Sequence, residues 1–144
     1  MRYFSTENIG RIFILSLSPG DFVLESIKDL IKKENVKNAI VISAIGTLDQ
    51  YRMHYVLTTD FPPKNKFEHW KDKPLELAHI GGIIANGEPH LHVIVSDSEK
   101  AYAGHLEDSC RVLYLAEIVI IEIRDLNLKR VRDERRIQRL TEIS

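Results

Sequence analysis

Three histidines near the middle of the chain have the spacing of metal ligands. His90 and His92 are two residues apart in Pro-His-Leu-His-Val-Ile-Val, so on a β-strand both imidazoles leave the same face. His105 follows after a short connection that could return it to the pair. Three imidazole nitrogens suit a divalent transition metal such as Zn²⁺ and leave a coordination position for water or a carbonyl oxygen. The alternative is a pair of polar residues on a solvated sheet face, since this spacing also arises by chance.

Glu117 is the acid expected nearest to these histidines, because it lies in an adjoining apolar strand. It could be a fourth ligand, an acceptor for an imidazole N–H, or a general base, in which case the chain would be a zinc-dependent lyase or hydrolase. The alternative is a glutamate held in a salt bridge. Glu88 is interpreted as a turn residue, Cys110 as a small core residue and His54 as an ordinary strand residue.

The elements that must position the histidines are mostly strands. Residues 11–17 form a short apolar strand, and Ser18-Pro-Gly-Asp21 has the pattern of a capped helix start. The apolar spacing predicts a helix to about Glu34, with Asn35 as its stop.

After this helix, the sequence predicts strands over 38–45, 49–57, 75–80, from Asn86-Gly87 into the histidines, and over 111–123. Residues 61–66, with two adjacent prolines, are predicted as a loop, and 106–109 as a short helical turn. About seven strands with short connections and one firm helix indicate a mostly antiparallel α+β domain.

Several motifs in order resemble the plants-and-prokaryotes conserved (PPC) domain family. They are Pro89-His-Leu-His92 with Ser96-Asp97, then Gly104-His-Leu106, then Ala116-Glu-Ile-Val-Ile120, with Ser18-Pro-Gly-Asp21 and Gly46-Thr-Leu48 upstream. Ala103 departs from the family pattern, where glycine is usual, but the three histidines match. The resemblance runs over nearly the whole chain.

The resemblance implies a twisted antiparallel sheet with one main flanking helix, assembled as a homotrimer, and a metal at His90, His92 and His105. The fold of the family is similar to that of acetolactate decarboxylase, whose three-histidine zinc site polarises a carbonyl. In plants the domain is labelled DNA-binding and accompanies a separate AT-hook; no Arg-Gly-Arg-Pro occurs in this chain.

Composition and charge indicate the number of domains and the classes of partner to expect. The 144 residues are expected to form a single domain (1–144), and a net charge of −1 is not typical of a nucleic-acid-binding protein. The segment 124–144 is locally basic, with seven basic and three acidic residues between Arg124 and Arg139. That segment could follow phosphates or could be a solvated surface or a subunit contact.

The chain has no apolar run long enough for a membrane span and no apolar N-terminal stretch typical of a signal peptide. Its single cysteine rules out an internal disulfide. A cytoplasmic protein without membrane contacts is therefore expected.

Two hypotheses of function remain. The first is a zinc-binding protein whose three-histidine site accepts a small carboxylate or keto ligand. The alternative is a DNA-binding or transcription-regulatory protein.

Overall fold

A computed structural model describes residues 1–143. They form one helix, α1 (Val23–Lys33), and eight strands: β1 (Ile9–Leu17), β2 (Ala39–Val56), β3 (Asn65–Ala85), β4 (Glu88–Ser96), β5 (Ala101–Leu106), β6 (Arg111–Ile123), β7 (Leu128–Arg132) and β8 (Gln138–Glu142). Over this part of the chain, no helix combines the length and apolar character needed to cross a bilayer.

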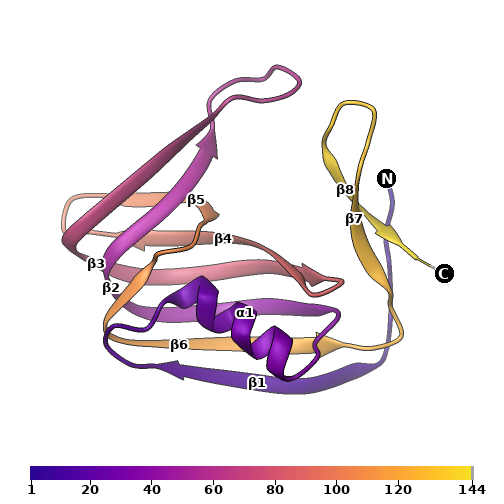
Figure 1. Ribbon diagram of the computed structural model, residues 1–144, viewed down its shortest axis with the longest axis horizontal. Helices are drawn as coiled ribbons and strands as arrows, with labels where there is room; N and C mark the ends of the chain where they lie inside the picture. The colour runs from indigo at the N-terminus through magenta and orange to yellow at the C-terminus, as the bar shows by residue number, and fades with distance from the viewer. Residues whose placement is uncertain (144) are drawn as a thin grey trace.

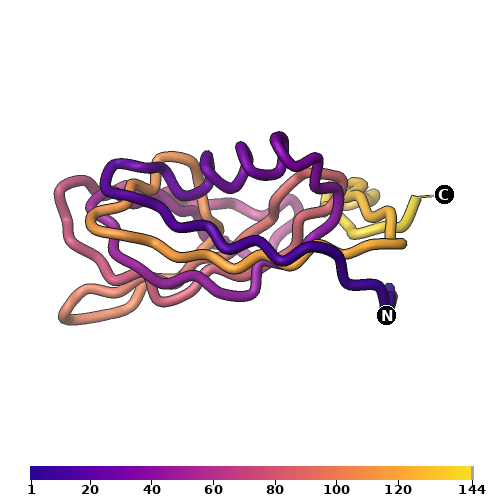
Figure 2. Tube along the Cα trace, turned by 90° about the horizontal axis from the view of Figure 1, so that it is seen from below, coloured from indigo at the N-terminus to yellow at the C-terminus, as the bar shows by residue number. Residues whose placement is uncertain are grey.

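Six strands form one antiparallel sheet in the order β1-β6-β2-β3-β4-β5, and β7 and β8 form a separate hairpin beside it (Figure 1). The far end of β2 also pairs with β5, so the strands from β2 to β5 close on themselves. Helix α1 lies on one side of the sheet (Figure 2). The prediction of a mostly antiparallel α+β fold with one flanking helix is therefore confirmed.

The strands are longer than the sequence predicted. Segments 38–45 and 49–57 belong to one strand, β2, and 75–80 is only the middle of β3. The apolar alternation breaks near Leu48 because the pairing of β2 with β3 shifts register between Leu48 and Gln50. Such a bulge reverses which residues face the core without ending the strand.

The helix begins later than the sequence predicted. Phe22 is its N-cap and makes no side-chain capping bond, so the predicted start at Ser18 is wrong. Instead, the Asp21 carboxylate accepts a hydrogen bond from the Ser18 amide, which closes a turn before the helix. Asn35 has a φ of 52° just after the helix, which confirms the predicted stop.

Two further segments differ from the prediction. The predicted helical turn at 106–109 is wrong, because Leu106 ends β5 and 107–109 are irregular; the basic segment contains the β7–β8 hairpin, which the sequence did not indicate. The hairpin is anchored by a small second core, in which Leu126 and Leu128 pack with Ala85 of β3. This contact joins residues about forty positions apart, so no local sequence pattern predicts it.

The core lies between α1 and the inner side of the sheet. Val23, Ile27 and Ile31 of the helix pack there with inward-facing residues of β2 and β6. The opposite side carries exposed apolar residues on three neighbouring strands, and we call it the outer face: Ile12, Ile14, Ile40, Ile42, Ile45 and Leu115. In a single chain this apolar surface is uncovered.

Arg11 ties three elements of the fold together. Its guanidinium donates to both carboxylate oxygens of Glu122 on β6, at 3.0 and 2.9 Å, and to the Glu34 carboxylate at 3.0 Å beyond α1. These hydrogen bonds lower the pKa of Glu122 to about 2, from an ordinary 4.5. A carboxyl with a depressed folded-state pKa stabilises the fold above its unfolded pKa and loses this contribution as pH falls.

We expect the free energy of unfolding to decrease between about pH 5 and pH 2, in part through Glu122. Glu122→Gln should remove roughly 1–2 kcal/mol at pH 7, since Arg11 is partly exposed and solvent screens the pair. In this variant, the free energy of unfolding should also fall less between about pH 5 and pH 2. Urea unfolding followed by Trp70 fluorescence at fixed protein concentration measures both, with the exposed Glu7→Gln as control. An equal acid dependence in Glu122→Gln and the parent chain would contradict the assignment.

Candidate metal centre

Four histidines from three strands meet at one end of the sheet. His90 and His92 lie on β4, and His105 on β5 pairs directly with His92. The same residue, His105, pairs on its other side with His54 of β2, where the sheet closes. The connection from β4 to β5 therefore returns His105 to the pair, as the sequence predicted.

The rings of the three predicted ligands are neighbours in the structure. The ring centroids of His90, His92 and His105 are 5.1, 5.6 and 5.7 Å apart. Two imidazoles on a tetrahedral Zn²⁺ have centroids roughly 5.2 Å apart, from a Zn–N bond of about 2.1 Å and about 1.1 Å more to each ring centre. The centroids are close to this spacing, but the ring nitrogens of all three histidines do not lie within 4.8 Å of one another, so the rings would have to turn or shift before they could share an ion.

A glycine beside the site lets β5 approach β2 closely. A Cβ atom at Gly104 would lie 2.7 Å from the backbone oxygen of His54 and 2.8 Å from the Met53 sulfur. A side chain at this position would push the strands apart, and His105 would move away from His54. Gly104 therefore has a structural role in assembling the cluster.

Glu107 fixes the orientation of two of the rings. Its Oε1 lies 2.6 Å from Nδ1 of His54 and 3.2 Å from Nδ1 of His105. A carboxylate that accepts from a ring Nδ1–H leaves the Nε2 of a neutral ring free to bind a metal ion. This carboxylate–imidazole arrangement is the usual support behind a metal-binding histidine.

A second set of ligands overlaps the first. His54, His105 and Glu107 each offer a ligand atom within 4.8 Å of the others. The rings of His54 and His105 are stacked, with centroids 4.5 Å apart, which is closer than two ligands of a tetrahedral ion. Among residues 1–143, this second set is the one whose ligand atoms already converge, and His105 is common to both sets.

The surroundings of His90 and His105 favour the neutral imidazole. Partial burial, together with the charges of His105, Arg130 and His92, lowers the pKa of His90 to about 4. Burial and the neighbouring His54 also lower the pKa of His105, although Glu107 opposes this. A neutral ring has the free lone pair that binding a cation requires.

Glu117 is not brought to the histidines within one chain. It is exposed on β6 and pairs with Ser16 and Ile45. Ile45 precedes His54 by nine residues of extended chain, on the order of 30 Å. The acid that contacts the cluster is Glu107.

The other candidate residues have structural positions. Glu88 is exposed at the β3–β4 turn, and its backbone oxygen accepts from Arg130. Cys110 is fully buried, and its thiol donates to the backbone oxygens of Arg52 and Glu107 at 3.3 and 3.4 Å. Burial raises the pKa of this thiol to about 12, so it is an unreactive core residue, as the sequence indicated.

The sequence interpretation missed His54 and Glu107. Glu107 follows His105 by two positions, and this spacing is the signal that could have placed both on one side of the strand. His54 gave no such signal, because it reaches the cluster only through the β2–β5 pairing of residues fifty-one positions apart.

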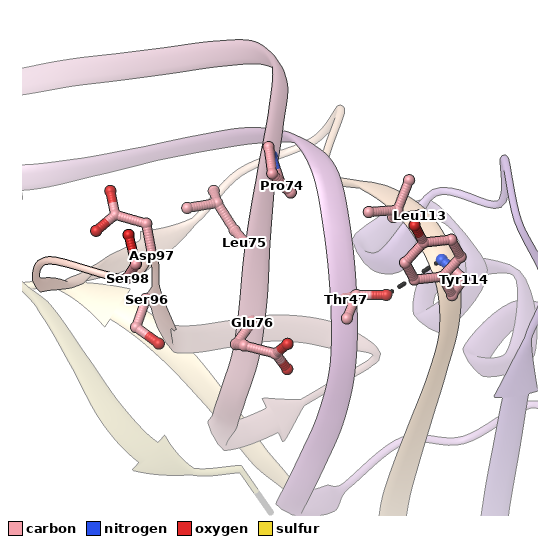
Figure 3. A pocket seen from close by; sticks show the side chains of 9 residues that line it. All are labelled: Thr47, Pro74, Leu75, Glu76, Ser96, Asp97, Ser98, Leu113 and Tyr114. Carbon is pink, nitrogen blue, oxygen red and sulfur yellow. Dashed lines mark hydrogen bonds between the residues drawn. The ribbon is translucent and has the colours of Figure 1, made fainter.

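A smaller cleft of about 370 Å³ lies at another part of the sheet, between β3, β6 and the end of β4 (Figure 3). Its one aspartate, Asp97, forms an ion pair with Lys73 at 2.6 Å. The same carboxylate accepts hydrogen bonds from the Tyr102 hydroxyl and from two backbone amides. Thr47 accepts a hydrogen bond from the Tyr114 amide. The Asp97 contacts stabilise the loop after β4, and the Thr47 contact joins β2 to β6.

Comparison with known families places this geometry in a wider context. Residues 4–124 match the model of the Plants and Prokaryotes Conserved (PCC) domain. The chain belongs to this family. The matched region contains all four histidines and Glu107 and ends before the β7–β8 hairpin.

Solved structures share the fold of this PCC-domain chain. A plant- and prokaryote-conserved protein from Pyrococcus horikoshii is 27% identical, with a TM-score of 0.79 over 98% of this chain and 99% of that one. A metal-containing protein from Archaeoglobus fulgidus is 22% identical, with a TM-score of 0.79 over 94% and 95% of the two chains. A protein from Bacteroides thetaiotaomicron, described as a candidate DNA-binding protein, is 17% identical, with a TM-score of 0.77 over 95% and 96%. The last two likenesses show the fold alone.

Among curated proteins, the bifunctional protein GlmU of two Synechococcus strains is 26% and 24% identical over 124 residues, or 85% of this chain. The match covers only 18% and 19% of those proteins. The chain thus spans about a fifth of the length of the curated relatives that it matches.

Proposed function

We propose that this chain is a cytoplasmic, homotrimeric metal-binding protein that holds Zn²⁺ or a similar ion through His90, His92 and His105. The observation that carries the proposal is the spacing of these three rings, 5.1 to 5.7 Å between centroids. Glu107 would hold His105 from behind, with His54 at its side. The metal-containing protein from Archaeoglobus fulgidus lends support from a related fold.

The proposed ligand is a small carboxylate or a keto compound. Three histidines leave a coordination position open, and Zn²⁺ bound there would polarise a carbonyl or hold a carboxylate oxygen. Within one chain, Glu107 would keep the imidazoles in the required tautomer and orientation. If the site catalyses a reaction, a zinc-dependent lyase or hydrolase fits this chemistry.

The proposed trimer would bury the apolar residues of the outer face. Ile14 is 74% exposed and Ile45 is 52% exposed, which leaves an apolar surface that other copies of the chain would bury. Glu117 lies within this face, and no ion pair in residues 1–143 involves it. It stays in the proposal as a base only if the contact between subunits brings it to the site of another copy.

Metal content is the direct test of the proposal. Protein purified without a histidine tag, stripped with chelator and dialysed, should take up about one Zn²⁺ per chain in a calorimetric titration. Element analysis of the untreated protein should show which ion is resident. A stripped chain that binds no divalent transition metal, while remaining folded by circular dichroism, would refute the proposal.

DNA binding is the alternative, because structural relatives from two organisms are described as candidate DNA-binding proteins. In this chain the basic segment is partly neutralised: Arg139 pairs with Asp133, and Arg130 is bound to backbone oxygens. Duplex binding that falls steeply with salt, survives chelation and is lost on replacing Arg132, Arg135 and Arg136 would favour this alternative. The same preparation can be used for both measurements.

A further inference from the structure

A cleft of about 770 Å³ lies between the histidines and the β7–β8 hairpin. His54, His90 and His105 line one side, and Lys129, Arg130 and Arg136 line the other. Figure 1 shows the hairpin standing beside the sheet, across from the long β2–β3 arm. Among residues 1–143, Glu88 supplies the one carboxylate that lines the cleft, so these walls carry a net positive charge.

The hairpin is held firmly against the sheet. The buried side chain of Asn38 donates to the Leu126 oxygen at 2.5 Å and accepts from the Leu128 amide at 3.2 Å. Arg130 donates to the backbone oxygens of Ile83 and Glu88, at 2.7 and 2.9 Å. With the small second core, these bonds fix the distance between the hairpin and the histidines before any ligand binds.

The tip of the hairpin also bridges the cleft. The Arg135 guanidinium lies 5.1 Å from the centre of the Phe61 ring, at the end of the β2–β3 arm. Asp133 accepts hydrogen bonds from the amides of Arg135 and Ile137 and from the Arg139 side chain, which fixes the turn at the tip. Arg136 sits in this turn with a φ of 63° and lines the cleft.

Two of the three cationic side chains on the hairpin side of the cleft are free to bind an anion. Arg130 is committed to backbone oxygens, but Lys129 and Arg136 are exposed and form no ion pair within residues 1–143. Two free cations that face three histidines across a preformed cleft form a second anchoring point for an anion. The hairpin lies beyond the region matched by the family model, so this wall is not part of the matched domain.

We propose that the cleft binds a small molecule with two anionic groups, a dicarboxylate in its simplest form. One carboxylate would lie on the metal held by the histidines, and the other would meet Lys129 and Arg136. This assignment rests on the metal site proposed above and specifies its ligand class.

Titration calorimetry of the zinc-loaded protein tests the proposal with malonate, succinate, glutarate and acetate as probes. At least one dicarboxylate should bind about tenfold or more tightly than acetate, which can engage only one anchoring point. The double variant Lys129→Gln/Arg136→Gln should weaken that dicarboxylate about tenfold and leave acetate unchanged. Arg132→Gln is the matched control, because Arg132 is exposed on the same hairpin but lines a different cleft.

The outcomes separate this proposal from the metal site. If zinc binds but no dicarboxylate exceeds acetate, or if the double variant and Arg132→Gln behave alike, the second anchoring point is refuted and the metal site stands. If no zinc binds, both proposals fail. Zinc affinity should be the same in all these variants, so a loss of dicarboxylate binding with intact zinc binding identifies Lys129 and Arg136 as the contacts.

Discussion

Replacing His105 with alanine is expected to abolish metal binding. His105 belongs to both possible ligand sets, the one with His90 and His92 and the one with His54 and Glu107. Two remaining imidazoles hold Zn²⁺ poorly, so the dissociation constant should rise by at least about 100-fold, more than the loss of a supporting residue causes. Calorimetry on the stripped variant and element analysis of the untreated one measure the loss.

Two further variants distinguish the ligand sets. His92→Ala should remove most of the metal if His90, His92 and His105 are the ligands. Glu107→Gln should then weaken binding only about 10- to 100-fold, since Glu107 would support the imidazoles without touching the ion. His69→Ala is the matched control, because His69 is exposed on β3 and belongs to neither ligand set. Full metal content in His92→Ala would show that His54, His105 and Glu107 hold the ion instead.

Placing a charge on the outer face is expected to dissociate the proposed trimer. The parent chain should sediment at about three times the 16.6 kDa mass of one chain at micromolar concentration. Ile42→Asp would bury an unpaired carboxylate in each contact, at a cost of several kcal/mol, so the assembly should weaken by about 100-fold or more. Sedimentation velocity across a range of concentrations follows the change.

Val131→Asp is the control for this substitution. Val131 is 42% exposed, close to the 45% of Ile42, but lies on the β7–β8 hairpin and not on the outer face. This variant should remain assembled. A parent chain that sediments as a stable monomer at micromolar concentration, or a trimer that tolerates Ile42→Asp, would contradict the proposed interface.

The sequence determined the features that depend on local periodicity and on short motifs. The strand at 111–123 and the stop of the helix at Asn35 agree with the structure, because alternation and turn preferences act within a few residues. The two-residue spacing of His90 and His92 places both on one side of β4 for the same reason. The resemblance to the family, carried by motifs in order, also proved correct. A single domain over 1–144 stays a prediction.

Only the tertiary structure decided what completes the site. His54 and Glu107 join the cluster because β2 curves round to pair with β5, and Gly104 leaves the space for that contact. Glu117 was expected nearby because it follows in an apolar strand, but the sheet order places β6 on the other side of β2 from β3. The hairpin is held at the cleft by Asn38 and Arg130, which bind backbone oxygens about ninety and about forty-five residues away along the chain. Such contacts depend on strand order and closure, which no local pattern of residue types encodes.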